Sequence, residues 1–410
     1  MNKYKIIAYI FTLFYAVFIL NYEPSFYNDD SLFLTRGIDN FSVIDFSPHF
    51  PGYVVIVILG KFINIFVNES KYSFFLLSSL CAVFLPLLMF FYVKNFADEK
   101  KAFIVFLISI SSVYLMNLSL SMLSDSVGFF FFFLSLHMYE LKKNKLTGFA
   151  FSVALFSRPS YFIFFVIGFI YIYFTNKKSL KEILIYFLFG TFLFLSYTFF
   201  YNGYLYIEEA IRFTQGHFEL WGVGQNSDIK WIDNILKFEN IPYLLLIFSI
   251  FSFKKEYIFL WILFLSYFLW MIFAQNADNI RHMIPLVFLA NIIIVLSIKN
   301  KILILVPFLI INFYAHSFYK EKISPLENIA KYINNNNNEA IIITNRGIEV
   351  LREKLKNKIV DGYYKNSAGF IANNKKSLII TTNKPKYKNY KEFRGRFIGE
   401  QNLYLFESQN

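Results

Sequence analysis

Charged residues, histidine and cysteine are all scarce in this chain of 410 residues. Asp, Glu, Lys and Arg together make up 17% of it, whereas a soluble domain carries about 25% charged residues. The five histidines show no metal-ligand spacing, and no P-loop or dinucleotide motif is present. The single cysteine, Cys81, excludes an intrachain disulfide. These absences exclude a soluble cytosolic enzyme, a disordered chain and a disulfide-stapled secreted domain.

Apolar residues are abundant instead. They make up 56% of the chain, and 55 residues are phenylalanine. Apolar runs of about 17 residues or more recur from Lys5 to Phe318, which predicts a polytopic α-helical membrane protein. The first run, Ile6–Leu20, follows two lysines and has no small-residue cleavage site after it, so we expect a retained signal anchor with its N-terminus inside. The other apolar segments lie at about 52–67, 72–93, 102–118, 126–140, 146–174, 183–201, 241–253, 257–275, 282–298 and 302–318.

Lysine clusters predict the orientation of these segments, because short cytoplasmic loops are enriched in lysine. Placing all the clusters inside requires segment 146–174 to cross twice, with an outer turn at Arg158-Pro159. It also leaves segment 52–67 along the outer interface. The prediction is about eleven crossings, a cytoplasmic N-terminus and an outer C-terminus, in what we expect to be a prokaryotic inner or plasma membrane. The clusters are Lys3/Lys5, Lys94/Lys100/Lys101, Lys142/Lys143/Lys145, Lys177/Lys178/Lys181, Lys254/Lys255 and Lys299/Lys301.

The last 91 residues differ from the rest. Residues 1–319 form the predicted membrane domain, and residues 320–410 read as a small α/β domain on the outer side. This second part holds 17 Lys and Arg against 9 Asp and Glu, without a motif for reading nucleic-acid bases. The basic charge suits anionic lipid headgroups, or it reflects a lysine-rich composition bias. The expected elements are helices at 324–333 and about 348–355, strands at 340–344 and 378–382, and a terminal hairpin at 394–406.

Two acidic positions follow apolar helices on the predicted outer side. Asp29 and Asp30 are adjacent, which suits a general base or a pair of metal ligands. Alternatively, they solvate a loop or cap a helix that starts at Ser31. Asp125 opens a very apolar segment, where a carboxylate needs a function or a partner. The alternative is that Ser124 or Asp125 caps that helix.

Basic and aromatic residues on the same side complete the set of candidates. Arg158 and Arg281, followed by His282, suit phosphate oxygens, with structural ion pairs as the alternative. The loop at 202–237 carries Arg212, His217 and Trp221. Its His and Trp suit phosphate contact or sugar stacking, and Trp221 equally suits an interfacial anchor.

The arrangement resembles the GT-C membrane glycosyltransferases, in particular the branch with dolichyl-phosphate-mannose protein mannosyltransferases and the lipid A aminoarabinose transferase. Asp29-Asp30 stands where that family has an acidic pair in its first outer loop. The run Pro48-His49-Phe50-Pro51-Gly52-Tyr53 stands at its His-Pro-Pro-type motif, although Phe50 interrupts the double proline. Ser124-Asp125 resembles the second acidic position, and Arg158-Pro159 and Arg281-His282 resemble the later basic positions.

The resemblance implies a polyprenyl-phosphate sugar donor and an acceptor hydroxyl on a lipid, glycan or protein. Asp29 or Asp30 would be the base of an inverting transfer. Arg158, Arg281, His282, Arg212 and His217 would face the donor phosphate. His49, Tyr53 and Trp221 would contact the sugar or acceptor. No cofactor is firmly implied, and a divalent metal stays open.

Two other classes remain as alternatives. An O-antigen ligase-like transferase would place its large outer loop late in the chain, whereas 202–237 is in the middle. A transporter of polyprenyl lipid or sugar would show charges at the bilayer midplane or repeated halves, and the sequence has neither.

Overall fold

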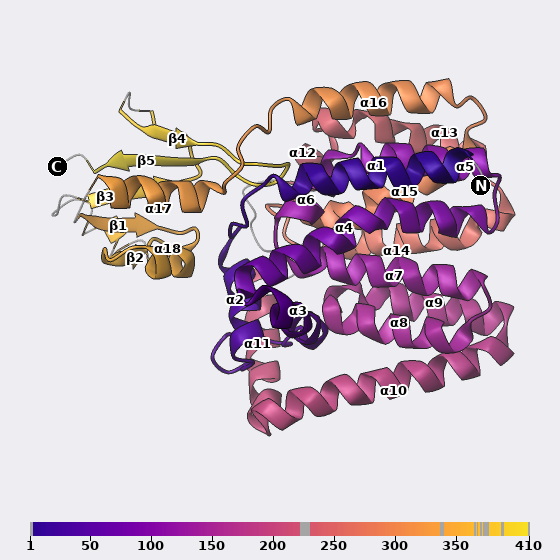
Figure 1. Ribbon diagram of the computed structural model, residues 1–410, viewed down its shortest axis with the longest axis horizontal. Helices are drawn as coiled ribbons and strands as arrows, with labels where there is room; N and C mark the ends of the chain where they lie inside the picture. The colour runs from indigo at the N-terminus through magenta and orange to yellow at the C-terminus, as the bar shows by residue number, and fades with distance from the viewer. Residues whose placement is uncertain are drawn as a thin grey trace.

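The computed structural model describes residues 3–221, 230–336 and 340–408, apart from 365, 367, 370, 372–376 and 387–388. This part of the chain is mostly helical, with a five-stranded sheet after residue 340. The long helices run side by side, the N-terminus lies at one end of the bundle, and the sheet projects from the other end (Figure 1).

The helical part ends at His316. Its 3-10 helices within the described residues are η1 (Pro159–Tyr161), η2 (Phe238–Leu244), η3 (Lys255–Tyr257) and η4 (Ile280–Met283). Its α-helices within the described residues are α1 (Lys3–Leu20), α2 (Asp29–Asp39), α3 (Val54–Val67), α4 (Ser70–Lys94), α5 (Glu99–Ile110), α6 (Val113–Leu120), α7 (Ser124–Glu140), α8 (Asn144–Ser157), α9 (Phe162–Thr175), α10 (Lys177–Asn202), α11 (Leu205–Trp221), α12 (Trp231–Ile235), α13 (Leu245–Phe251), α14 (Ile258–Ala274), α15 (Ile284–Ser297) and α16 (Ile302–His316).

Five helices in the described part are long and apolar enough to cross a membrane, and they are consistent with the predicted class of membrane protein. They are α1, α4, α10, η3 with α14, and η4 with α15. The bent pair α5–α6, with 62° between its halves, would make a sixth. Other apolar segments form helices of fewer than 18 residues, so the eleven crossings expected from the sequence stay a prediction. The η4–α15 helix is almost wholly buried in the bundle, whereas α1 and α10 lie at its periphery.

The predicted break within residues 146–174 is present. Helix α8 ends at Ser157, Pro159 opens η1, and α9 begins at Phe162. Proline lacks the amide hydrogen that a continuous helix needs and restricts the residue before it, so Arg158 is held between two helices. The predicted interfacial segment 52–67 forms α3, a helix of 14 residues. It packs against α2 and α4 at the end of the bundle nearer the sheet (Figure 1).

The sheet of the C-terminal part has the strand order β2-β1-β3-β5-β4. Strands β2, β1 and β3 are parallel, and β5 runs antiparallel to both β3 and β4. Ser324 caps α17 by accepting a hydrogen bond from the Glu327 amide, at the helix start that the sequence predicts. The elements are α17 (Pro325–Asn335), β1 (Ile341–Thr344), α18 (Ile348–Lys354), β2 (Ile359–Asp361), β3 (Ser377–Thr381), β4 (Lys391–Phe393) and β5 (Leu403–Glu407).

Two helices and two strands of this part confirm the sequence prediction, but the terminal hairpin is shifted. Its strands are 391–393 and 403–407, whereas most of the expected hairpin, Arg394–Asn402, forms the connection between them. The reason is that this connection contacts the helical part instead of pairing with a strand. The Asn117 side chain donates to the Ile398 carbonyl at 2.8 Å, and the Tyr27 hydroxyl donates to the Gly399 carbonyl at 3.2 Å.

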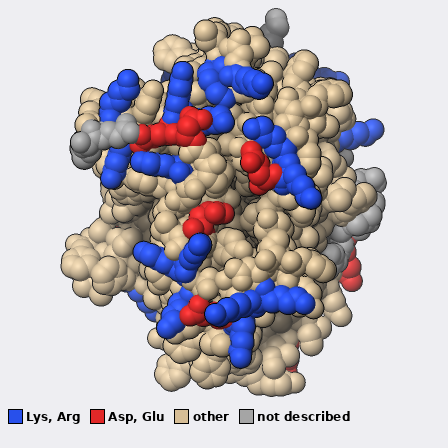
Figure 2. Space-filling view, turned by 90° about the vertical axis from the view of Figure 1, so that its right-hand side faces the viewer, with Lys and Arg blue, Asp and Glu red and all other residues tan. Residues whose placement is uncertain are grey.

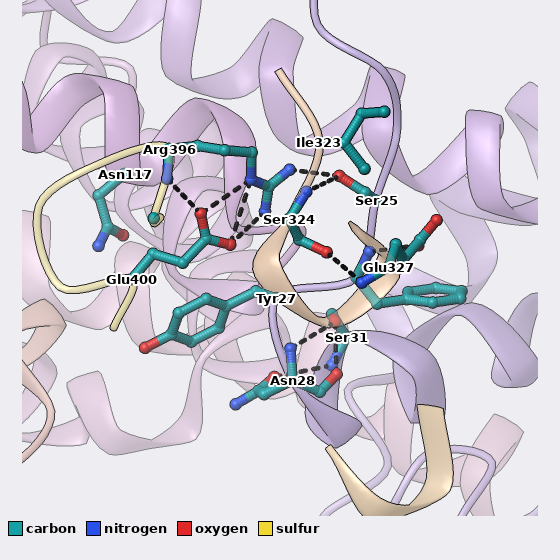
Figure 3. Close-up of polar contacts among 12 residues, drawn as sticks. Ser25, Tyr27, Asn28, Ser31, Asn117, Ile323, Ser324, Glu327, Arg396 and Glu400 are labelled. Carbon is teal, nitrogen blue, oxygen red and sulfur yellow. Dashed lines mark hydrogen bonds and ion pairs between the residues drawn. The ribbon is translucent and has the colours of Figure 1, made fainter. Parts of the chain in front are cut away.

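A buried ion pair fixes this connection (Figure 3). Arg396 is fully buried, and its guanidinium donates to the Glu400 carboxylate at 2.6 Å. The same guanidinium donates to the Ser25 hydroxyl at 2.6 Å, and the Ser324 amide also donates to this hydroxyl. Ser25 lies in the connection between α1 and α2 of the helical part. The two parts of the chain therefore share one polar core. A buried charge is tolerated only when its partners are in place.

The end of the bundle that holds the N-terminus is rich in lysine. Figure 2 views this end, where basic side chains spread over the face and acidic ones are fewer. The start of α1, the end of α4 and the start of α10 each carry one of the lysine clusters identified in the sequence. This face is the one that the sequence predicts to be cytoplasmic.

Glu400→Gln should lower the free energy of unfolding by about 3–5 kcal/mol, because it leaves the buried Arg396 charge uncompensated. The matched control is Glu23→Gln, which breaks the exposed Glu23–Lys331 pair and should cost about 1 kcal/mol or less. Denaturant unfolding of the detergent-purified chain measures both. Equal losses in the two variants would contradict the structural importance of the buried pair.

Candidate active site

A cavity of about 430 Å³ opens at the end of the bundle nearer the sheet. This volume lies within the range of small-molecule sites. Four separate stretches of the chain form its wall. They are α2 with the α2–α3 connection, the α8–η1 junction, α11, and the segment from the end of α14 to η4. The lining residues are Asp30, His49, Phe50, Pro51, Tyr53, Arg158, Pro159, Ser160, Phe213, Thr214, Trp270, Ala274, Gln275, Asn276, Asn279, Arg281 and His282.

The acidic pair lies in the first turn of α2. Asn28 is the N-cap and exchanges capping bonds with Ser31, so the alternative that the Asp residues cap a helix starting at Ser31 is wrong. Asp30 lines the cavity, and its Oδ2 lies 3.4 Å from Nη2 of Arg281. Burial would raise the pKa of Asp30, but the positive charges of His49, Arg281 and Arg158 outweigh it and lower this pKa below its usual value. The Asp30 carboxyl group is therefore ionised at neutral pH.

Asp29 points away from the cavity. Its Oδ1 accepts hydrogen bonds from the Glu349 and Val350 amides of α18, at 3.0 and 3.1 Å. Burial raises the pKa of Asp29 to about 6, although these two hydrogen bonds act in the opposite direction. The two adjacent carboxylates thus have different partners: Asp30 belongs to the cavity, and Asp29 holds the C-terminal part.

Asp125 lies between two arginines. Its Oδ1 is 3.2 Å from Nε of Arg158, and its Oδ2 is 3.9 Å from Nη1 of Arg281. Arg158 also donates from Nη1 to the Ser124 hydroxyl at 3.1 Å. The N-cap of α7 is Leu123 and makes no side-chain capping bond, so the capping alternative for Ser124 and Asp125 is wrong. All three charged side chains are nearly buried, at 4% exposure for Asp125, 8% for Arg158 and 12% for Arg281.

Glycine permits this arrangement at one close contact. A Cβ atom at Gly128 would lie 2.4 Å from the Cβ atom of Arg158. The lack of a side chain on α7 therefore lets Arg158 reach Asp125. The result is a continuous chain of alternating charges, Arg158–Asp125–Arg281–Asp30, whose members come from four different elements of the fold. The ion-pair alternative for the arginines is thus present, and both arginines also line the cavity.

His49 and Tyr53 lie together at the wall of the cavity. The Tyr53 hydroxyl and Nε2 of His49 are 3.4 Å apart, and the His49 ring stacks on Phe213 with 5.2 Å between centroids. His282 also lines the cavity and is buried. These three residues, proposed from the sequence, therefore lie in the same cavity as Asp30.

The long loop at 202–237 contributes differently from its prediction. Arg212 does not line the cavity; its side chain is 64% exposed and pairs with Glu209 at 2.6 Å. Its neighbours Phe213 and Thr214 line the cavity instead. The side chains of His217 and Trp221 lie outside the described residues, so both remain predictions.

Several lining residues are not among those predicted from the sequence, including Trp270, Asn276 and Asn279. Trp270 lies within an apolar run and has no distinguishing signal of its own. The only signal in the sequence is the group of polar residues after that run, which indicates that the helix ends there. Several buried polar atoms here have no hydrogen-bond partner among the described residues, including Oδ2 of Asp125, Nε of Arg281 and the Ser160 hydroxyl. The two donors among these atoms, Nε of Arg281 and the Ser160 hydroxyl, are places where ligand oxygens can bind.

The described residues contain no group of three or more His, Cys, Asp or Glu side chains that could hold a metal ion. Comparison with protein-family models, curated proteins and solved structures finds no match for this chain. The site itself combines the ionised Asp30 carboxylate, two guanidinium groups and aromatic walls around a space of ligand size.

Stability should depend on pH through Asp29. Because its pKa rises from 3.8 to about 6 on folding, this group's contribution is fully present below pH 3.8 and is lost as pH rises through 6. Asp29→Asn keeps a carbonyl acceptor for α18 without the charge. Relative to this variant, the wild-type chain should lose roughly 1 kcal/mol of unfolding free energy between about pH 5 and about pH 7.5. Denaturant unfolding at both pH values tests this, and a pH-independent difference would contradict it.

Proposed function

We propose that this protein is an inverting glycosyltransferase that moves a sugar from a polyprenyl-phosphate donor to an acceptor hydroxyl at the outer face of a membrane. The observation that carries the proposal is the ion-pair chain at the cavity. It brings an ionised carboxylate within 3.4 Å of a guanidinium group that is itself paired to a second carboxylate. A site that binds only a neutral sugar would not need so many buried charged side chains.

Asp30 is the proposed base. It is ionised, it faces the cavity, and about a third of its side chain is exposed to an incoming acceptor. Asp29 is unsuited to this role because α18 occupies one of its oxygens. Asp30 would take the proton of the acceptor hydroxyl as the hydroxyl oxygen bonds to the anomeric carbon. The bond from that carbon to the phosphate oxygen breaks, which inverts the configuration.

Arg158 and Arg281 are the proposed phosphate clamp. The leaving lipid phosphate gains negative charge, and planar guanidinium groups bind phosphate oxygens well. Nε of Arg281 is buried without a hydrogen-bond partner among the described residues, which leaves one donor ready for such an oxygen. Asp125 would hold both arginines in position in the free protein. His49, Tyr53 and Phe213 offer aromatic surfaces to the sugar.

The proposed orientation places the cavity outside and the lysine-rich end inside, with about eleven crossings. The support is that the lysine clusters and the cavity lie at opposite ends of the bundle (Figures 1 and 2). The C-terminal part projects from the cavity end and would share its compartment.

Asp30→Asn should lower transfer from a polyprenyl-phosphate sugar by about 10²–10⁴-fold, because the amide cannot accept the proton. Asp29→Asn is the matched control and should keep transfer within about threefold, since an amide oxygen can still accept the α18 hydrogen bonds. The assay follows release of lipid phosphate and formation of product with radiolabelled donor in vesicles. Full transfer by Asp30→Asn would disprove the base assignment, and movement of intact donor across the bilayer without cleavage would indicate a transporter.

The orientation has its own test. A reporter enzyme that is active only outside the membrane should be active when fused after residue 410. The same reporter inserted at the lysine cluster of residues 142–145 should be inactive. A cytoplasmic C-terminal reporter would contradict the outer location of the cavity.

A further inference from the structure

A second, smaller cavity lies between the helical part and the C-terminal part. It has a volume of about 70 Å³, and its polar lining includes Tyr27, Asn28, Asn279, Arg346, Glu400 and Gln401. We call it the interface cavity. Asn279 also lines the main cavity, so the two spaces adjoin. Tyr27 and Asn28 directly precede the acidic pair in the chain.

The charge of the interface cavity is set by Arg346. Glu400 is its acidic neighbour, but both Glu400 oxygens accept hydrogen bonds from Arg396. That carboxylate is therefore neutralised within the buried pair of Figure 3. Nε of Arg346 is buried and has no hydrogen-bond partner among the described residues. Unpaired buried donors of this kind are uncommon unless a ligand or water completes them.

The position of Arg346 is fixed by its backbone. The Thr344 hydroxyl accepts from the Arg346 amide at 3.0 Å and donates to the Arg346 carbonyl at 3.1 Å. The next residue, Gly347, has φ of +60° and lies so close to Leu326 that a Cβ atom would be 2.4 Å from its Cδ1. The Arg346 side chain therefore starts from a rigid turn. A rigid backbone favours a role in ligand binding, because less conformational freedom is lost when the ligand binds.

The size of the space limits the ligand. The cavity volume of about 70 Å³ is much smaller than that of the main cavity and suits a single phosphate or carboxylate group. A guanidinium with neighbouring amide and hydroxyl groups is the pattern that binds phosphate or carboxylate. The remainder of such a ligand would extend past Asn279 toward Asp30.

We propose that the interface cavity binds an anionic group, a phosphate or a carboxylate, carried by the acceptor, an inference that rests on the proposed glycosyl transfer. The C-terminal part then selects acidic acceptors, and its Arg346 is the residue that recognises them. The hydroxyl to be glycosylated lies on the portion of the acceptor that enters the main cavity.

Binding of three small sugars to the detergent-purified full chain tests this directly. Saturation-transfer NMR would compare glucose 6-phosphate, glucuronate and neutral glucose. At least one acidic sugar should bind about tenfold or more tightly than glucose, because a hydrogen bond to a charged group is lost with the neutral ligand. Preference for the phosphate or for the carboxylate identifies the source of the anion. Equal binding of all three sugars would overturn the proposal.

Variants separate this cavity from the main one. Arg346→Gln should abolish the preference for the acidic sugar. Arg352→Gln is the matched control, because Arg352 lies on α18, the helix that follows Arg346, pairs with Glu349 and does not line the cavity. An unchanged preference in Arg346→Gln would overturn the assignment. A preference that Arg281→Gln removes and Arg346→Gln keeps would place the anion in the main cavity and overturn the assignment.

The outcome is independent of the transferase assay. If the preference depends on Arg346 but Asp30→Asn transfers sugar normally, the anion site stands and the proposed function fails. If Arg346→Gln binds as the wild type does but Asp30→Asn loses transfer, the function stands and the acceptor site fails.

Discussion

The alternating chain of charges Arg158–Asp125–Arg281–Asp30 is the interaction on which the site depends. Each of its nearly buried members would be costly alone at the end of an apolar bundle, so each requires the next. The chain joins α2, α7, the α8–η1 junction and η4, which are far apart in sequence. Pairing these charges therefore sets the relative positions of the helices and builds the cavity wall in the same step.

The C-terminal part is bound to this site from two directions. Asp29 holds the start of α18, and the β4–β5 connection contacts Tyr27 and Asn117. The start of α2, which carries Asp30, is therefore fixed between the bundle and the C-terminal part. This geometry gives the C-terminal part a role in shaping the site, beyond that of a soluble appendage, and places the interface cavity next to the proposed chemistry.

Much of the site could be predicted because charge in an apolar setting is conspicuous. Asp125, Arg158 and Arg281 each interrupt or open an apolar run, and burial then requires that they pair. The different roles of Asp29 and Asp30 could not be predicted, since they depend on a helix about 320 residues further along the chain.

The partner of Arg212 is local. Glu209 stands three residues before it, and this pair could have been predicted if the segment had been expected to be helical. Strand β2 has three residues, too few to give a periodic signal, and the shifted hairpin reflects contacts with the helical part.

The proposed role of the buried arginines Arg158 and Arg281 is to bind a lipid phosphate. Native mass spectrometry of the detergent-purified chain with polyprenyl phosphate and with the polyprenol of equal chain length tests it most directly. We expect the phosphate form to bind about tenfold or more tightly, and we expect Arg158→Gln or Arg281→Gln to remove this advantage. Equal affinity for the two lipids, or an advantage that survives both substitutions, would contradict it.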